Sequence, residues 1–226
     1  MAQMISLWTF ACKLYNEPTV KNACLQLQDD NDVNVPLLLT ACWLIASSAV
    51  ISSAHATQLQ AIASDWNDGC IQSLRALRKS MKARLSNQES NDDDMAAWAL
   101  VREQVKAVEL LAEQQLLQQM ECYVQQQMLP ISKTESDNSQ SKVIMFTNTF
   151  DNGVQWVDHA FTVLEKCLPA LIGALPQFSS ESSSKSSPKS PQARSAIADI
   201  ILSIMPVGVP AASQMSYDDV LERISR

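Results

Sequence analysis

Val35–Ile51 reads VPLLLTACWLIASSAVI and contains no charged residue. Its apolar side chains fall nearly all around a helix rather than on one side, so neighbouring helices should surround it. At 17 residues the stretch also reaches the short limit for a membrane span. Pro36, Thr40, several serines and the lack of a basic flank argue against a span. We therefore expect Val35–Ile51 to form the central helix of a soluble core.

The composition of the whole chain also favours helices. The 226 residues are 46% hydrophobic, which is enough for a substantial core, and only 4 are glycine. Sheet proteins need many tight turns, and glycine is their usual source of positive φ. We expect an all-α protein: a compact multi-helix bundle with one long helix at about 95–128, followed by a disordered Ser-rich linker and short tail helices.

Capping residues predict where the first helices begin. Ser6 suits the start of a helix that continues through Tyr15, and Pro18 suits the first turn of a second helix. Asn34 is a good N-cap for the apolar helix, and Ser52 or Ser53 starts the helix after it. The next helix is basic, runs to about Leu85, and leads into a polar loop at about 86–94.

Met95–Met128 has apolar residues at spacings of three and four, which predicts one helix about 50 Å long at ~1.5 Å per residue. Such a helix could form a coiled coil, but it has too few paired charges at the flanking positions to favour that alternative. We expect the apolar row to face inward; it consists of Trp98, Val101, Val105, Val108, Ala112, Leu116, Met120 and Val124.

The C-terminal part divides by composition. A polar linker at 131–142 precedes a helix at 152–175, with a bend expected at Pro169 because proline cannot donate the next hydrogen bond. The stretch 178–192 is low in complexity and rich in serine, which predicts disorder. We expect a helical domain at 5–177, this linker at 178–192, and a short helical tail at 193–226 that binds a partner or folds back.

Basic residues concentrate on one helix face. Arg75, Arg78, Lys79 and Lys82 share a face, and Trp66 precedes them as a candidate half-exposed anchor. We expect these five residues to bind an acidic protein partner. Nucleic acid or a phosphate ligand is an alternative that the net charge of −7 disfavours. A second alternative is structural, in which Glu109 and Glu113 of the long helix pair with Arg75 or Arg78.

No set of residues predicts catalysis. His55 and His159 have no partners at metal-ligand spacing, and no glycine-rich phosphate loop is present. The six cysteines are scattered and suit small buried hydrophobes. We therefore expect no metal, no cofactor and no membrane span, and we keep an enzyme with a pocket between helices as a less favoured alternative. The N-terminus lacks the pattern of a signal peptide, so we expect a cytoplasmic protein.

Four stretches in order resemble a family of small, all-helical, uncharacterised bacterial proteins, classed as a domain of unknown function. The likeness covers about residues 5–124 and continues weakly to 164. The resemblance implies no activity, substrate or cofactor; it implies only that the basic helix belongs to the domain. The linker at 131–142 and everything after Phe178 depart from the pattern of the family. The stretches are Leu7–Tyr15, Ala23–Asp29, Val33–Leu44 and Leu74–Lys82.

Overall fold

The computed structural model describes residues 5–87, 92–128, 153–173, 190–204 and Val220. Every regular element in these ranges is helical, which confirms the all-α prediction. The linker predicted at 131–142, most of the serine-rich stretch and most of the tail after Ile204 lie outside the described residues. The elements are α1 (Leu7–Tyr15), α2 (Pro18–Asn31), α3 (Val35–Ala46), α4 (Ser53–Trp66), the π-helical turn η1 (Asn67–Ile71), α5 (Gln72–Asn87), α6 (Asp92–Tyr123), the π-helical turn η2 (Val124–Met128), α7 (Gly153–Cys167), α8 (Pro169–Gly173) and α9 (Ser190–Ile204).

The apolar helix α3 lies at the centre of the core, as predicted. It is buried from Val35 to Ile45 and contacts α1, α4, α6, α7 and α9. Its Trp43 is 1% exposed, and the indole Nε1 donates to the Ile5 carbonyl oxygen at 3.1 Å. The buried Thr40 hydroxyl donates to the Pro36 carbonyl oxygen at 2.8 Å, so its polar atom is satisfied. Among the described helices, none is both long and apolar enough to cross a membrane.

The predicted caps set the helix starts. The side-chain oxygens of Ser6, Asn34 and Ser52 each accept a hydrogen bond from a backbone N–H three residues further on, at 3.0–3.2 Å. Such bonds satisfy a donor that the first helical turn leaves without a partner. These three helix starts could therefore be predicted from local sequence alone.

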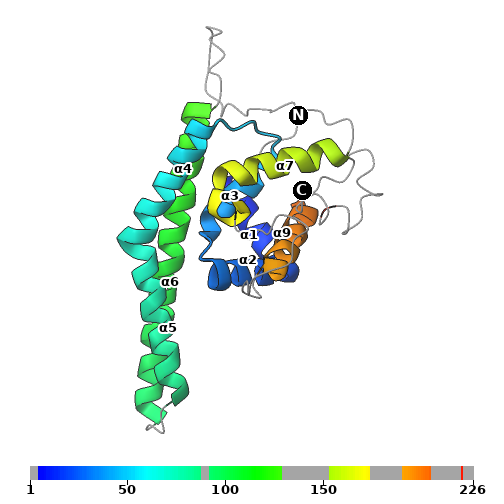
Figure 1. Ribbon diagram of the computed structural model, residues 1–226. Coiled ribbons are helices and arrows are strands. Elements are labelled where there is room, and N and C mark those ends of the chain that lie inside the picture. The colour runs from blue at the N-terminus through cyan, green and yellow to red at the C-terminus, as the bar shows by residue number, and fades with distance from the viewer. Residues whose placement is uncertain (1–4, 88–91, 129–152, 174–189, 205–219, 221–226) are drawn as a thin grey trace.

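α4 continues into α5 through η1, so Asp68 and Gly69 lie in a π-helical turn that joins the two helices without a loop. α5 and α6 form a hairpin, and Figure 1 shows this hairpin extending well beyond the other helices. α6 begins at Asp92, so residues 92–94 of the predicted loop are helical. This correction has a simple reason: carboxylates are favourable at a helix N-terminus.

The C-terminal helices complete the same core. α7 ends at Cys167 and Pro169 begins α8, which confirms the expected bend. α9 packs against α2 and α3 through buried Ala196, Ile197 and Ile201. It begins at Ser190, so the last three residues of the predicted linker are helical, and Pro191 is tolerated because it lies in the first turn.

Candidate interaction surface on the α5–α6 hairpin

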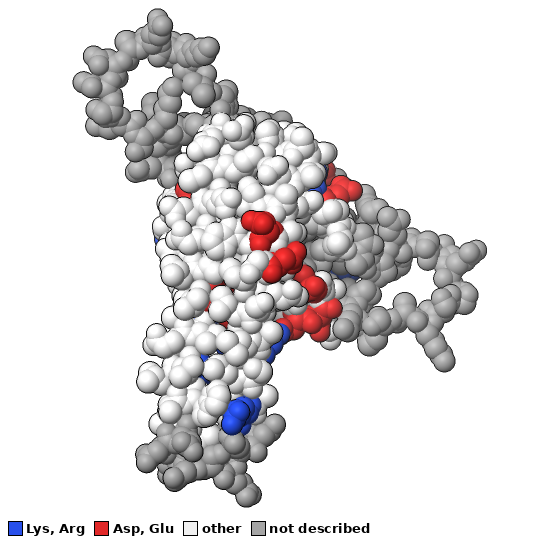
Figure 2. All heavy atoms as spheres, turned by 90° about the vertical axis from the view of Figure 1, so that its left-hand side faces the viewer, with Lys and Arg blue, Asp and Glu red and all other residues white. Residues whose placement is uncertain are grey.

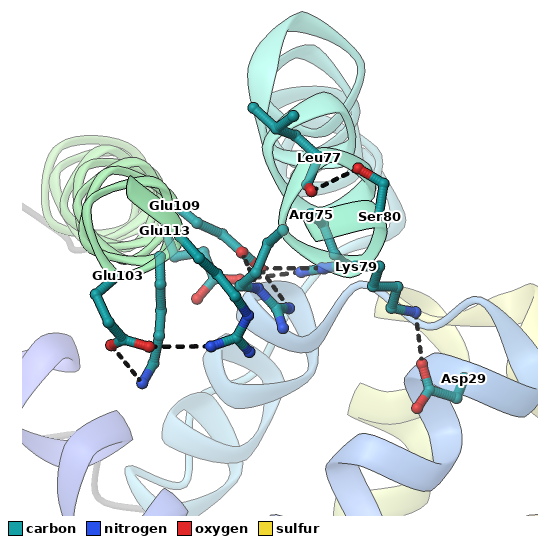
Figure 3. Close-up of polar contacts among 11 residues, drawn as sticks. Asp29, Arg75, Leu77, Lys79, Ser80, Glu103, Glu109 and Glu113 are labelled. Atoms are coloured by element: carbon teal, nitrogen blue, oxygen red, sulfur yellow. Dashed lines mark hydrogen bonds and ion pairs between the residues drawn. The ribbon is translucent and has the colours of Figure 1, made fainter. Parts of the chain in front are cut away.

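Arg75 points from α5 toward Glu109 and Glu113 of α6 (Figure 3). Arg78 of α5 also pairs with Glu109. Arg75 donates through Nη2 to Glu113 Oε1 at 3.0 Å and through Nε to Glu109 Oε1 at 3.4 Å. Arg78 donates to both oxygens of Glu109, with Nη2 at 3.1 Å from Oε1. The structural alternative named from the sequence is therefore confirmed: these two cations pair within the fold.

Burial explains why this four-residue network is needed. Glu109 is only 6% exposed, and a carboxylate that leaves water requires a charged or hydrogen-bonding partner. Its hydrogen bond raises the pKa of Arg78, which keeps the guanidinium charged. Burial also raises the pKa of Glu113, and the neighbouring Arg75 only partly opposes that effect. The network ties the two helices of the hairpin together.

The other predicted binding residues lie apart from this network. Lys79 Nζ is 3.0 Å from Asp29 Oδ1 of α2, and both side chains are more than half exposed. Lys82 is exposed and forms no ion pair with any described residue. Trp66 is half-buried against the core, and its Nε1 donates to Gln119 Oε1 at 2.6 Å. The five residues therefore do not form one continuous exposed surface.

The raised pKa of Glu113 predicts a pH effect on stability. The folded protein holds this proton more tightly than the unfolded chain, so the contribution of Glu113 is fully present below the ordinary pKa of 4.5. It is lost as the pH rises through the folded-state pKa. The native chain should therefore lose stability relative to Glu113→Gln between pH 4.5 and pH 7, as measured by urea unfolding. A relative gain over that range would show that the ion pair with Arg75 outweighs burial.

The outer side of α6 carries exposed apolar residues. Leu100, Val101, Val108 and Leu111 are 48–65% exposed. Val101 and Val108 were predicted to face inward, and that prediction was wrong. The hairpin extends past the body of the protein, and among the described helices it is α5 that packs along α6 at this level (Figure 1).

These residues belong to a longer uncharged face, which we call the α6 stripe. All its members are exposed, and they recur at spacings that place them on one side of the helix. The stripe is about 38 Å long at ~1.5 Å per residue. Its members are Ala97, Leu100, Val101, Gln104, Ala107, Val108, Leu111, Gln115, Gln118 and Cys122.

None of the charged side chains that the structure describes on α6 belongs to the stripe. Glu103, labelled in Figure 3, accepts from Arg102 Nη1 at 3.0 Å and from Lys106 Nζ at 3.3 Å, so one carboxylate pairs with both cations. Figure 2 shows the left-hand side of the view in Figure 1, along which the hairpin lies: uncharged atoms cover most of it, and acidic side chains form one diagonal row. Near the hairpin tip, Arg84 lies 4.3 Å above the Trp98 ring, a cation–π contact that covers this half-buried indole.

Three other potentially reactive side chains, His55, Cys24 and Cys167, are engaged or buried. His55 Nδ1 lies 2.9 Å from the Tyr123 hydroxyl oxygen. Burial raises the pKa of Cys24 and of Cys167 to about 12, so neither thiol is reactive. Cys122, in contrast, is exposed on the α6 stripe. Nowhere in the described ranges do three His, Cys, Asp or Glu side chains gather as a metal site would require.

Comparison with known proteins gives one match. The model of the family described as "Protein of unknown function (DUF2390)" matches residues 6–120, about half of the chain. No curated protein and no solved structure matches the chain. The matched range includes α5, most of α6 and all of the apolar part of the α6 stripe. The chain therefore belongs to the DUF2390 family of proteins of unknown function.

Proposed function

We propose that this protein is a non-catalytic helical interaction module, that its docking surface is the α6 stripe, and that the stripe packs against the α6 stripe of a second copy of the chain. The observation that carries this proposal is the exposure of four large aliphatic side chains on one uncharged helix face. Contiguous exposed apolar surface of this kind marks interaction sites on soluble proteins.

The spacing within the stripe supports a helix as the partner. Val101, Gln104, Val108 and Leu111 follow the alternation of three and four that keeps a seam facing another helix in a coiled coil. Val101 and Val108 occupy one class of core position, and Gln104 and Leu111 the other. The pattern continues toward the C-terminal end of α6 with glutamines, which can hydrogen-bond across a helix pair.

Charge supports a second copy of the chain. Each chain carries a net charge of −7, so a surface without like-charge contacts favours the association of two copies. The stripe is uncharged, including Leu100 and Ala107, which lie beside the seam formed by Val101, Gln104, Val108 and Leu111. In the sequence, the few paired charges beside the apolar row of α6 argued against a coiled coil. In a dimer, the same lack of charge means that the two α6 helices do not repel each other. It also means that no charged pairs select the partner.

An antiparallel arrangement places the apolar residues together. Antiparallel helices pair the two classes of core position with each other. A two-fold axis near position 106 then sets Val101 opposite Leu111 of the second copy, and Gln104 opposite Val108. Two α5–α6 hairpins joined in this way form a four-helix bundle with both α6 helices at its centre.

The basic residues have less support as the docking surface. Arg75 and Arg78 already pair with Glu109 and Glu113, and releasing them would leave buried carboxylates without partners. Only Lys79 and Lys82 remain exposed on that face, and Lys79 already meets Asp29. We therefore move the proposed contact with another protein from the basic face to the α6 stripe.

Light scattering of the purified chain tests the proposal. The native chain should have twice its mass of 24.9 kDa, whereas Val108→Glu should be monomeric, because it places two carboxylates in an apolar seam near the two-fold axis. We expect the variant to dissociate at least roughly 100-fold more readily. Val50→Glu is the matched control: Val50 is 66% exposed between α3 and α4, and this variant should remain dimeric.

Two outcomes would reject this function. A native chain that stays monomeric at about 100 μM would exclude a dimer of useful affinity. A Val108→Glu variant that keeps the dimeric mass would show that the copies associate through another surface. Circular dichroism of both variants should match that of the native chain, because both valines are at least half exposed.

A further inference from the structure

A pocket of about 280 Å³ opens between α1, α2, α3 and α6. Leu110, Glu113 and Leu117 line it from α6, and their spacing places them on a different face of that helix from the α6 stripe. Its volume lies just below the roughly 300–1,000 Å³ of sites for drug-sized ligands. The pocket therefore fits a small molecule rather than a peptide.

The walls of this pocket are largely apolar and partly aromatic. Pro36 and Leu39 of α3 line it together with Leu110 and Leu117. Trp8 of α1 adds the face or edge of an indole, and aromatic rings pack favourably against one another. A planar ring suits these walls better than a polar ligand does.

One charged group lines the pocket. Glu113 accepts a hydrogen bond from Arg75 through Oε1, and its two oxygens can accept several more. Tyr15 lines the pocket as well, and burial raises the pKa of its hydroxyl, so this group stays neutral. The pocket therefore combines an apolar wall with a hydrogen-bond acceptor.

The charge balance of the site favours an uncharged ligand. The two arginines and two glutamates of the network already cancel. A charged ligand would bring an uncompensated charge into a largely apolar space, which is costly. A neutral O–H or N–H donor avoids that cost and can still bond to the carboxylate.

We propose that this pocket binds a small neutral aromatic molecule with one hydroxyl or N–H donor, its ring between Trp8, Pro36 and Leu110 and its donor on Glu113. The site is independent of the proposed self-association, because it uses another face of α6.

A pair of probes tests the ligand class. In ligand-observed NMR titrations, 4-ethylphenol should bind the full chain with a Kd of about 0.1–1 mM, typical of so small a ligand. 4-Ethylanisole has the same ring but a methyl ether in place of the donor. It should bind about tenfold or more weakly, because a hydrogen bond to a charged acceptor is lost.

Consecutive leucines of α6 provide a matched pair of variants. Leu110 is 53% exposed and lines the pocket, whereas Leu111 is 54% exposed and lies on the α6 stripe. Leu110→Ala should weaken 4-ethylphenol binding about threefold or more, since an apolar wall is lost, and Leu111→Ala should leave it unchanged. Glu113→Leu should abolish the preference for the phenol while the ether still binds, which shows that the pocket remains folded.

Three results would overturn the proposal. The first is that neither probe binds. The second is that Leu110→Ala and Leu111→Ala have the same effect, which would place the binding elsewhere. The third is equal affinity for the phenol and its ether, which would remove Glu113 from recognition. None of these results depends on whether the chain is a dimer, because only the stripe variant should change the mass.

Discussion

Replacing Arg78 by methionine should lower the free energy of unfolding by about 2–4 kcal/mol, because it leaves the buried carboxylate of Glu109 poorly paired. Breaking a fully buried ion pair typically costs about 3–5 kcal/mol. For Arg78→Met we expect a loss of stability near or below the lower end of that range, because the Arg78 side chain is 24% exposed and Arg75 still reaches Glu109. Methionine retains most of the aliphatic length, so the loss reports on charge rather than on packing.

Two variants control this measurement by urea unfolding. Lys82→Met removes a positive charge one turn further along α5, where the side chain is exposed, and should change stability by less than about 0.5 kcal/mol. Arg78→Met combined with Glu109→Leu should recover much of the loss, since no carboxylate then remains buried without its arginine. A loss from Arg78→Met no larger than that from Lys82→Met would refute a structural role for the network.

Replacing Trp43 by alanine should cost about 3–5 kcal/mol, the usual range for removing a large aromatic side chain from a packed core. Trp43 is the largest fully buried side chain of α3, and α3 touches five other helices. The substitution leaves a cavity and removes the hydrogen bond to the Ile5 carbonyl oxygen. Thermal and urea unfolding, followed by circular dichroism, measure the effect.

Trp66→Ala is the comparison for Trp43→Ala. Trp66 is only half-buried, and its hydrogen-bond partner Gln119 is exposed, so its removal should cost clearly less. Trp43→Phe provides a milder variant if alanine prevents folding, with an expected loss of about 1–2 kcal/mol. Equal losses at positions 43 and 66 would contradict the central position of α3.

The features that depend on neighbouring residues could be predicted from the sequence. Ser6, Asn34 and Ser52 cap helices where expected, because a cap needs only its own side chain and the next three residues. α3 was placed in the core because a helix without a polar side must be surrounded. Both predictions depend on physics that acts within one or two turns.

The surface of the hairpin could not be predicted in the same way. Spacing shows which residues share a helix face, but not whether another helix covers that face. Val101 and Val108 continue the row of Ala112 and Leu116, yet only the latter two are buried, because α6 leaves the body of the protein at that level. The same limit applies to Arg75 and Arg78. A row of cations on a helix can pair with carboxylates of a neighbouring helix or face water, and the sequence does not distinguish the two.

The exposed Cys122 allows the most direct test of the proposed self-association. With Cys12 and Cys70 replaced by serine and the other thiols buried, a nitroxide attaches at Cys122 alone. Electron–electron dipolar spectroscopy then measures the distance between the labels of two copies. Antiparallel stripes centred near position 106 predict a separation of about 48 Å along the shared axis, at ~1.5 Å per residue. A parallel pair would instead bring the labels to within about 20 Å, and an isolated chain would give no dipolar signal; either result would contradict the account.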